Sequence, residues 1–273
     1  MVGSPSKAGR PIGVAHFSAI SLPPSDFARA AAAAGFSRIG LRLHPAFPGA
    51  PYYALPVGSS AAKELKALLN GEALEVFDIE FFVIDPSFDA SLLEPILAAA
   101  ANLGAKRLSV CGDDPEQDRL QSNFAEFCRL ASQYGLAVDI ENMGWRTVKT
   151  FDDCVKLINM ISAPNAGALV DAVHFFRNGG TLKSLSAEPE KVSHVQLCDV
   201  AGPAPATAEA MIAEARSQRL APGEGQLPLG ELMTVVGERA LVSVEVPLAG
   251  STDVGEHLKR LFQGASRILT QDH

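Results

Sequence analysis

Short apolar runs alternate along the chain with longer segments rich in Ala and Leu. The short runs contain β-branched and aromatic residues and favour strands, whereas the longer segments repeat apolar positions at the spacing of an amphipathic helix. This alternation is typical of a parallel sheet whose strands are connected by helices. We predict strands at residues 12–17, 38–43, 74–84, 107–112, 136–142, 166–171, 192–199 and 241–247.

Helix start and end signals lie between the predicted strands. PPSD precedes an Ala-rich segment at 28–34, and DDPEQD precedes a segment at 119–134. Eight βα units in 273 residues predict an α/β fold, a single closed (β/α)8 TIM barrel. The alternative is an open doubly wound sheet, but no strand is followed by a GxGxxG loop. Glycines follow four of the helical segments, as C-terminal capping residues commonly do, at positions 35, 71, 104 and 135.

Two connections and the N-terminus depart from this regular pattern. The polar residues 1–10 predict a flexible tail, and residues 11–273 the barrel domain. Connections 44–58 and 199–227 are longer than a minimal βα loop, and long loops on a catalytic rim usually shape the substrate pocket. Trp145 and the Tyr52/Tyr53 pair are expected in rim loops, where they either cover a substrate or anchor the loop.

Composition limits the classes of partner. Hydrophobic residues make up 47% of the chain, but no run reaches the roughly 18 apolar residues of a membrane span, so we expect a soluble protein. The formal charge of −8 disfavours a nucleic-acid partner, because such proteins usually carry a basic face. Four cysteines lie far apart without a CxxC pair, which favours reduced thiols and a cytoplasmic location. A small-molecule substrate fits these limits.

Oxygen-bearing side chains lie at or near the C-terminal ends of four predicted strands, at Glu141, Asp171, Gln196 and Glu245. Barrel strands point alternate side chains inward, and catalytic groups gather at their C-terminal ends. Burying an unpaired carboxylate in such a run is costly, and a shared divalent cation removes that cost. The alternative is a structural network in which each acid pairs with a barrel Arg or Lys.

The four side chains form a hard ligand set of three carboxylates and one amide oxygen. This set favours one divalent metal ion, Mn²⁺ or Mg²⁺, while Zn²⁺, Co²⁺ and Ni²⁺ remain open. His194 lies two residues before Gln196 and is a second-choice ligand, although a packed core histidine is the favoured interpretation.

The segments DIEN, LVDAVH, HVQLCD and VSVEVP, in this order and at these spacings, resemble the xylose isomerase-like TIM barrels, a group of sugar phosphate isomerases and epimerases. The resemblance covers nearly the whole chain. It implies that Glu141, Asp171 and Glu245 bind the metal ion. Gln196 departs from the family pattern, because many members have histidine there. Barrels of this family often pair, so a homo-oligomer is left open.

The resemblance also implies substrate-binding roles for His174, in a DxxH pattern, and for Arg219, in RLAPGEG. Arg177 is a second candidate for binding an anion, because guanidinium donors form a planar fork that suits carboxylate or phosphate. The remaining substrate-binding candidates are His16 at the end of the first strand and an inward pair in the pocket floor, Arg42 and Glu80.

Glu141 and Glu245 on opposite sides of a substrate would remove and return its α-proton, with a metal-stabilised enediolate between the two steps. We therefore predict a metal-dependent sugar or sugar phosphate isomerase or epimerase with a small hydroxy-carbonyl substrate. The alternative is a dehydratase, a lyase of a 3-dehydroshikimate-like acid, with Arg219 or Arg177 holding the carboxylate. A barrel without catalytic activity is a third hypothesis, which failure to bind any divalent cation would favour.

Overall fold

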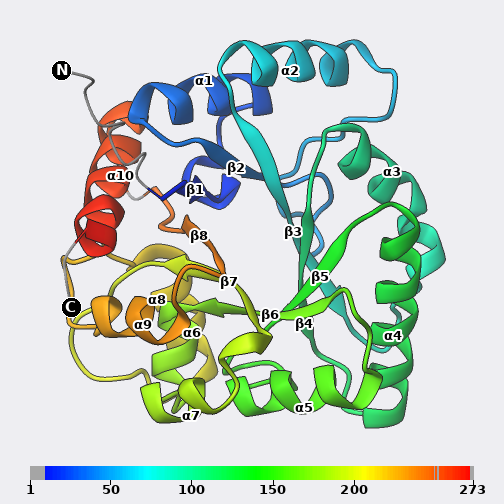
Figure 1. The fold of residues 1–273 in the computed structure, drawn as a ribbon, viewed down its shortest axis with the longest axis vertical. Coiled ribbons are helices and arrows are strands. Elements are labelled where there is room, and N and C mark those ends of the chain that lie inside the picture. The colour runs from blue at the N-terminus through cyan, green and yellow to red at the C-terminus, as the bar shows by residue number, and fades with distance from the viewer. Residues whose placement is uncertain (1–9, 249, 251, 271–273) are drawn as a thin grey trace, which may run out of the picture.

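Eight parallel strands form a closed ring in chain order, with β1 paired to both β2 and β8 (Figure 1). The computed structural model of the protein describes residues 10–248, 250 and 252–270. The ring confirms the predicted (β/α)8 TIM barrel. Its strands are β1 (Gly13–Val14), β2 (Arg38–Leu41), β3 (Glu75–Ile84), β4 (Arg107–Gly112), β5 (Ala137–Glu141), β6 (Ala166–Asp171), β7 (Val192–Leu197) and β8 (Leu241–Val244).

Helices connect the strands and surround the ring in Figure 1. No helix among the described residues combines the length and the apolar character needed to cross a membrane. The α-helices are α1 (Pro24–Ala34), α2 (Ser60–Gly71), α3 (Glu94–Asn102), α4 (Gln117–Gln133), α5 (Phe151–Ile161), α6 (Ala172–Arg177), α7 (Leu182–Ala187), α8 (Ala208–Ser217), α9 (Leu229–Val236) and α10 (Val254–Thr270); the 3-10 helices are η1 (His16–Ala19), η2 (Ala90–Leu93) and η3 (Pro189–Lys191).

The local signals explain most of these boundaries. α1 begins with Pro24 in its first turn and is capped at its C-terminus by Gly35, whose φ of 106° is the left-handed conformation that favours glycine. α5 begins with a capping box in which Thr150 and Asp153 satisfy each other's backbone N–H groups. Gly71 differs from its predicted capping role, because it is the last residue of α2 and Glu72 caps the helix.

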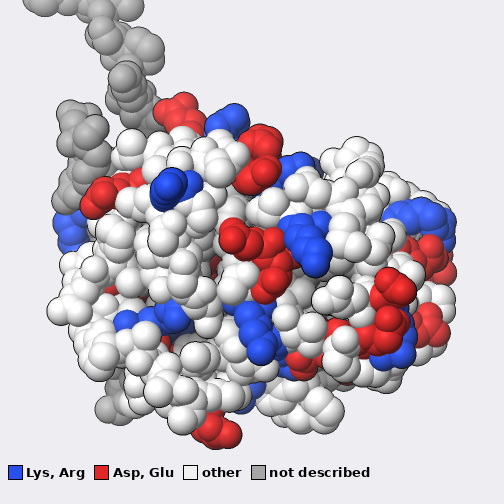
Figure 2. Space-filling model, turned by 90° about the horizontal axis from the view of Figure 1, so that it is seen from below, with Lys and Arg blue, Asp and Glu red and all other residues white. Residues whose placement is uncertain are grey.

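The predicted tail falls largely outside the described residues, which begin at residue 10. Arg10 itself is attached to the barrel, since its guanidinium donates hydrogen bonds to the carbonyl oxygens of Gly237 at 2.9 Å and Ala240 at 2.5 Å. On the face of the molecule in Figure 2, acidic and basic side chains are interspersed.

The strands of the barrel contact two buried regions, one between the strands and the helices and one inside the ring. Between the strands and the helices lies an apolar core, which includes the fully buried side chains of Phe27, Leu65 and Phe124. Inside the ring, below the strand ends, several buried side chains are charged or polar: Asp139 is fully buried and forms an ion pair with Arg107. Buried charge is tolerated when it is paired in this way. The polar interior forms the floor on which the candidate site lies.

Candidate active site

The four side chains that were predicted to bind a metal ion lie at the same end of the barrel. β5 ends at Glu141, β6 ends at Asp171, and Glu245 directly follows β8. Gln196 lies opposite Asp171 in the β6–β7 register. Glu141, Asp171 and Gln196 are 5%, 0% and 3% exposed, so these polar groups are withdrawn from water. Buried polar groups of this kind need hydrogen-bond partners, counter-ions or a metal ion.

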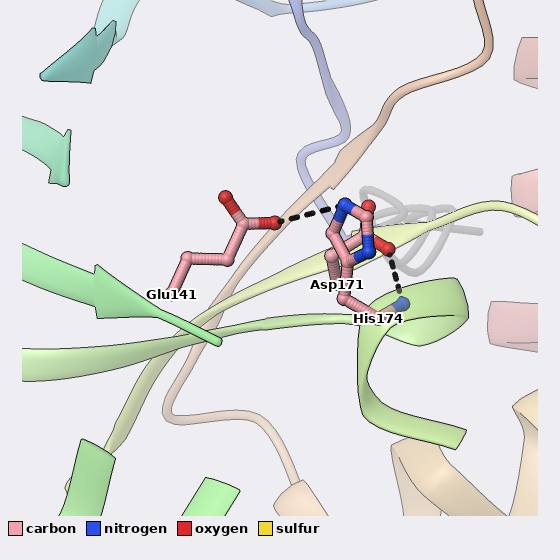
Figure 3. Close-up of side chains that lie close together, drawn as sticks. All are labelled: Glu141, Asp171 and His174. Atoms are coloured by element: carbon pink, nitrogen blue, oxygen red, sulfur yellow. Dashed lines mark hydrogen bonds and ion pairs between the residues drawn. The ribbon is translucent and has the colours of Figure 1, made fainter. Parts of the chain in front are cut away.

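The DxxH spacing is the geometry of a helix cap. Asp171 is both the last residue of β6 and the N-cap of α6, and its Oδ1 accepts a hydrogen bond of 3.0 Å from the backbone N–H of His174. This cap turns the imidazole toward Glu141, whose Oε1 lies 4.0 Å from Nε2 (Figure 3). Glu141, Asp171 and His174 offer metal-ligand atoms that all lie within 4.8 Å of one another.

Arg219 lies among the carboxylates, with its side chain 2% exposed. Its Nη1 is 2.5 Å from Asp171 Oδ2 and 3.2 Å from Glu245 Oε2. Nη2 donates to His174 Nε2 at 3.2 Å, which places the imidazole proton on Nδ1. The single guanidinium therefore connects residues from β6, from the start of α6 and from the end of β8.

The connection between β7 and β8 is folded back so that Arg219 reaches this position. Asp199 and Leu220 exchange two backbone hydrogen bonds of 2.9 and 2.8 Å. The Asp199 carboxylate then accepts from the backbone N–H groups of Gly223 and Leu227. A Cβ at Gly225 would lie 2.3 Å from Asp199 Oδ1, so only glycine fits this approach. Gly225 therefore permits the fold-back that places Arg219.

The carboxylates differ in their electrostatic environment. Burial raises the pKa of Glu141 well above its usual range, and the nearby Asp171 and Glu245 raise it further. Burial raises the pKa of Glu245 to about 7, although Arg219 opposes that shift. Burial would also raise the pKa of Asp171, but Arg219 and His174 together hold this pKa below the usual value. One arginine therefore faces three carboxylates, and it keeps the pKa of Asp171 low while those of Glu141 and Glu245 remain raised.

A divalent cation fits this arrangement. Glu141 has no hydrogen-bond partner among the described residues, and its neighbour His174 stays neutral because burial lowers the imidazole pKa to about 4. Gln196 lines the same pocket, where its amide oxygen is a further candidate ligand. Three carboxylates face one arginine in a site of oxygen donors, which is the charge and donor set of a divalent metal site.

Arg42 and Glu80 form the ion pair that the sequence suggested, at 2.9 Å. His16, however, does not reach the pocket. Its Nε2 lies 2.9 Å from the carbonyl oxygen of Leu22, and its Nδ1 accepts from the Arg42 backbone N–H at 3.3 Å. With both ring nitrogens used and the side chain fully buried, its expected substrate-binding role is wrong; it supports the Arg42 backbone instead.

Arg177 does not reach the pocket either. Its guanidinium pairs with Glu214 at 2.7 Å and donates to the carbonyl oxygens of Ala201 and Gly202. These partners use its donors to fasten the connection after β7 to α6, so we do not retain it as a substrate-binding residue. His194 is a packed core histidine as favoured, fully buried with Nε2 2.8 Å from Ser243 Oγ.

The aromatic side chains of the rim divide between two places. Trp145 lines the pocket and contacts His174 edge to face, with ring centroids 5.1 Å apart. Tyr53 stacks on His16 and donates to the carbonyl oxygen of Ile20, which is the loop-anchoring alternative. Tyr52 lines a separate apolar groove beside α3.

Several pocket residues escaped the sequence analysis. Phe17 and Phe81 flank the Arg42 guanidinium, with centroids 4.7 and 5.8 Å away. Arg216 lies three residues before Arg219, within connection 199–227. The length of that connection was the sequence feature that indicated a pocket residue there. The other pocket residues without a prior prediction are Phe47, Ser109, Met143, Arg146 and Ala215.

Comparisons with known proteins agree with this architecture. A family model described as xylose isomerase-like TIM barrel matches residues 28–263. A search of curated protein sequences finds no match. The search of solved structures finds many similar barrels, including a longer fusion protein of which this chain covers 42%.

Three solved structures illustrate the range of these neighbours. The IolI protein with a bound zinc atom is 15% identical, with a TM-score of 0.77 and coverage of 95% of this chain and 98% of that one. The probable 3-DHS dehydratase AsbF from Bacillus anthracis is 15% identical, with a TM-score of 0.75 and coverage of 96% and 100%. The 3-keto-D-glucoside 4-epimerase YcjR from E. coli is 15% identical, with a TM-score of 0.71 and coverage of 94% and 99%. At this identity the likeness shows the fold.

Proposed function

Because this chain belongs to the xylose isomerase-like TIM barrel family, we propose that it is a divalent-metal-dependent isomerase or epimerase of a sugar or sugar phosphate. The observation that supports the proposal most strongly is the set of Glu141, Asp171, Gln196 and Glu245 at one end of the barrel, with a single arginine among three carboxylates. Mn²⁺ or Mg²⁺ suits these oxygen donors, and the zinc-bound neighbour keeps Zn²⁺ open.

A divalent ion bound by these residues would supply Lewis-acid polarisation of a substrate carbonyl. Glu245, which directly follows β8 beside Arg219, would remove the α-proton as the general base. Glu141, which ends a different strand, would return the proton to the other face. Arg219 would hold the neighbouring Asp171 ionised and orient His174 through its Nη2 contact. Removing and returning the proton on opposite faces changes a stereocentre.

Solvent exchange tests this proposal. In D₂O with Mg²⁺, small hydroxy-carbonyl compounds should lose the NMR signal of their α-proton in the presence of the protein, and EDTA should stop the loss. The panel contains neutral ketoses, hydroxy-keto acids and ketose phosphates. Absence of exchange across this panel with the metal-loaded protein would contradict the proposal.

A second candidate is a lyase that removes the same α-proton and expels a β-hydroxyl from a 3-dehydroshikimate-like acid. The cationic lining of the pocket favours it, since Arg146 and Arg216 lie there in addition to Arg42 and Arg219. A conjugated product would absorb in the ultraviolet, whereas an epimer would not. Appearance of that absorbance with an anionic substrate would assign the lyase reaction.

We extend the proposal to the cellular location of the protein and to the kind of molecule that it binds. The four cysteines, all buried and unpaired, fit a reducing cytoplasm. A small molecule is the proposed partner, rather than a nucleic acid or a membrane.

A further inference from the structure

We propose that Arg216 binds an anionic group of the substrate, a carboxylate or a phosphate, and thereby makes substrate charge a determinant of specificity. This inference rests on the proposed function, because it concerns the substrate of the same pocket. Arg216 lies in the last turn of α8 and lines the pocket together with Phe47. It is exposed, so an incoming ligand can reach it.

Internal partners account for the other arginines of the pocket. Arg42 pairs with Glu80 at 2.9 Å and Arg146 with Asp113 at 2.5 Å. Arg219 contacts two carboxylates, as described above. Among the described residues, Arg216 has no carboxylate within ion-pair distance and no hydrogen-bond partner for its guanidinium. Arg216 is therefore the pocket arginine that has no carboxylate partner among the described residues.

The charges of the pocket leave room for an anion once a metal ion is bound. Asp171, Glu141 and Glu245 together carry three negative charges when ionised, and a divalent cation would match the two that remain after the single charge of Arg219. The charge of Arg216 would then have no carboxylate partner among residues 10–248, 250 and 252–270. The buried Nε atoms of Arg42 and Arg146 also have no partner in the described part of the chain. A ligand with an anionic group would complement this cationic side of the pocket.

The contact with Phe47 prepares Arg216 for this role. The guanidinium carbon lies over the Phe47 ring, 4.5 Å from its centroid, which is a cation–π contact. No described residue accepts a hydrogen bond from the guanidinium, so its planar fork of N–H donors remains available for two oxygens of a carboxylate or phosphate. Phe47 belongs to connection 44–58 and Arg216 to connection 199–227. The two long rim connections therefore meet at this contact.

The chain carries its own probe of the pocket, because its single tryptophan is Trp145. Tryptophan fluorescence of the Mg²⁺-loaded protein would be titrated with three compounds that share a hydroxy-ketone: neutral dihydroxyacetone, hydroxypyruvate and dihydroxyacetone phosphate. We expect at least one anion to bind about tenfold more tightly than dihydroxyacetone, since it gains a charge-assisted hydrogen-bond pair. The stronger anion identifies carboxylate or phosphate as the recognised group.

Variants assign the preference to Arg216. Arg216→Gln should abolish the preference for anions, and Arg216→Lys should retain part of it. The matched control is Arg239→Gln, which removes the same charge from an exposed residue just before β8, at the opposite end of the barrel, and should leave all three affinities unchanged.

Equal affinities for the three compounds would overturn the inference, as would an anion preference that survives in Arg216→Gln. The solvent-exchange assay separates this failure from that of the proposed function. Exchange without a charge preference contradicts only the role of Arg216. An Arg216-dependent preference without exchange of any compound contradicts only the isomerase proposal.

Discussion

Replacing Glu245 by glutamine is expected to slow α-proton exchange by about 10²–10⁴-fold, the usual contribution of a positioned general base. Glutamine keeps the size of the side chain, but it cannot accept a proton and is a weaker ligand for a divalent ion. In the metal-free protein, burial raises the pKa of Glu245 to about 7. Glu141→Gln should cause a comparable loss, since Glu141 has no other partner in the described structure. NMR in D₂O measures both rates.

Glu64→Gln is the control for these two variants. Glu64 is exposed on α2, away from the strand ends, and the same substitution there should leave exchange unchanged. Exchange at the wild-type rate in both site variants would show that neither carboxylate acts as the base.

Removal of Arg219 is expected to lower the free energy of unfolding of the metal-free protein by about 3–5 kcal/mol, because it leaves a buried charge without its partner. Arg219→Met keeps much of the volume but leaves Asp171, whose side chain is fully buried, without a counter-ion. The arginine lowers the pKa of Asp171 in the folded protein. Its contribution is therefore present above the unfolded-state pKa and is lost as pH falls through the lower folded-state pKa.

Urea unfolding in EDTA and in Mg²⁺ measures this effect. The loss should shrink when Mg²⁺ is added, because the ion supplies positive charge to the same carboxylates. Arg260→Met is the matched control, since its ion pair with Glu224 is partly exposed and should contribute less than about 1 kcal/mol. An Arg219 variant as stable as the wild type in EDTA would contradict this account of the site.

The order of elements followed from hydrophobic periodicity, whereas the strand ends did not. Residues 107–112 and 166–171 are strands with the predicted bounds. The predicted strands 12–17 and 241–247 are shorter in the structure, because His16 begins a 3-10 helix and β8 ends before Glu245. Apolar side chains continue beyond both strands, and periodicity alone cannot distinguish a strand from a buried rim.

Local patterns located the candidate ligands, but not the partners of every charged group. Asp171 and His174 were recognisable because a helix cap fixes their spacing. Arg177 was misassigned because its partner Glu214 lies 37 residues away in another connection. Arg216 was overlooked for a related reason. The other pocket arginines pair with carboxylates and Arg216 does not, and this difference can be seen only in the folded structure.

Calorimetric titration of EDTA-treated protein with Mn²⁺ tests the central claim, that four oxygen-bearing side chains at the strand ends bind one divalent ion. The account predicts about one equivalent of bound metal in the wild type and lost or clearly weakened binding in Glu141→Gln and Glu245→Gln. Absence of binding in the wild type with Mn²⁺, Mg²⁺ and Zn²⁺, or equal binding in both variants, would contradict it.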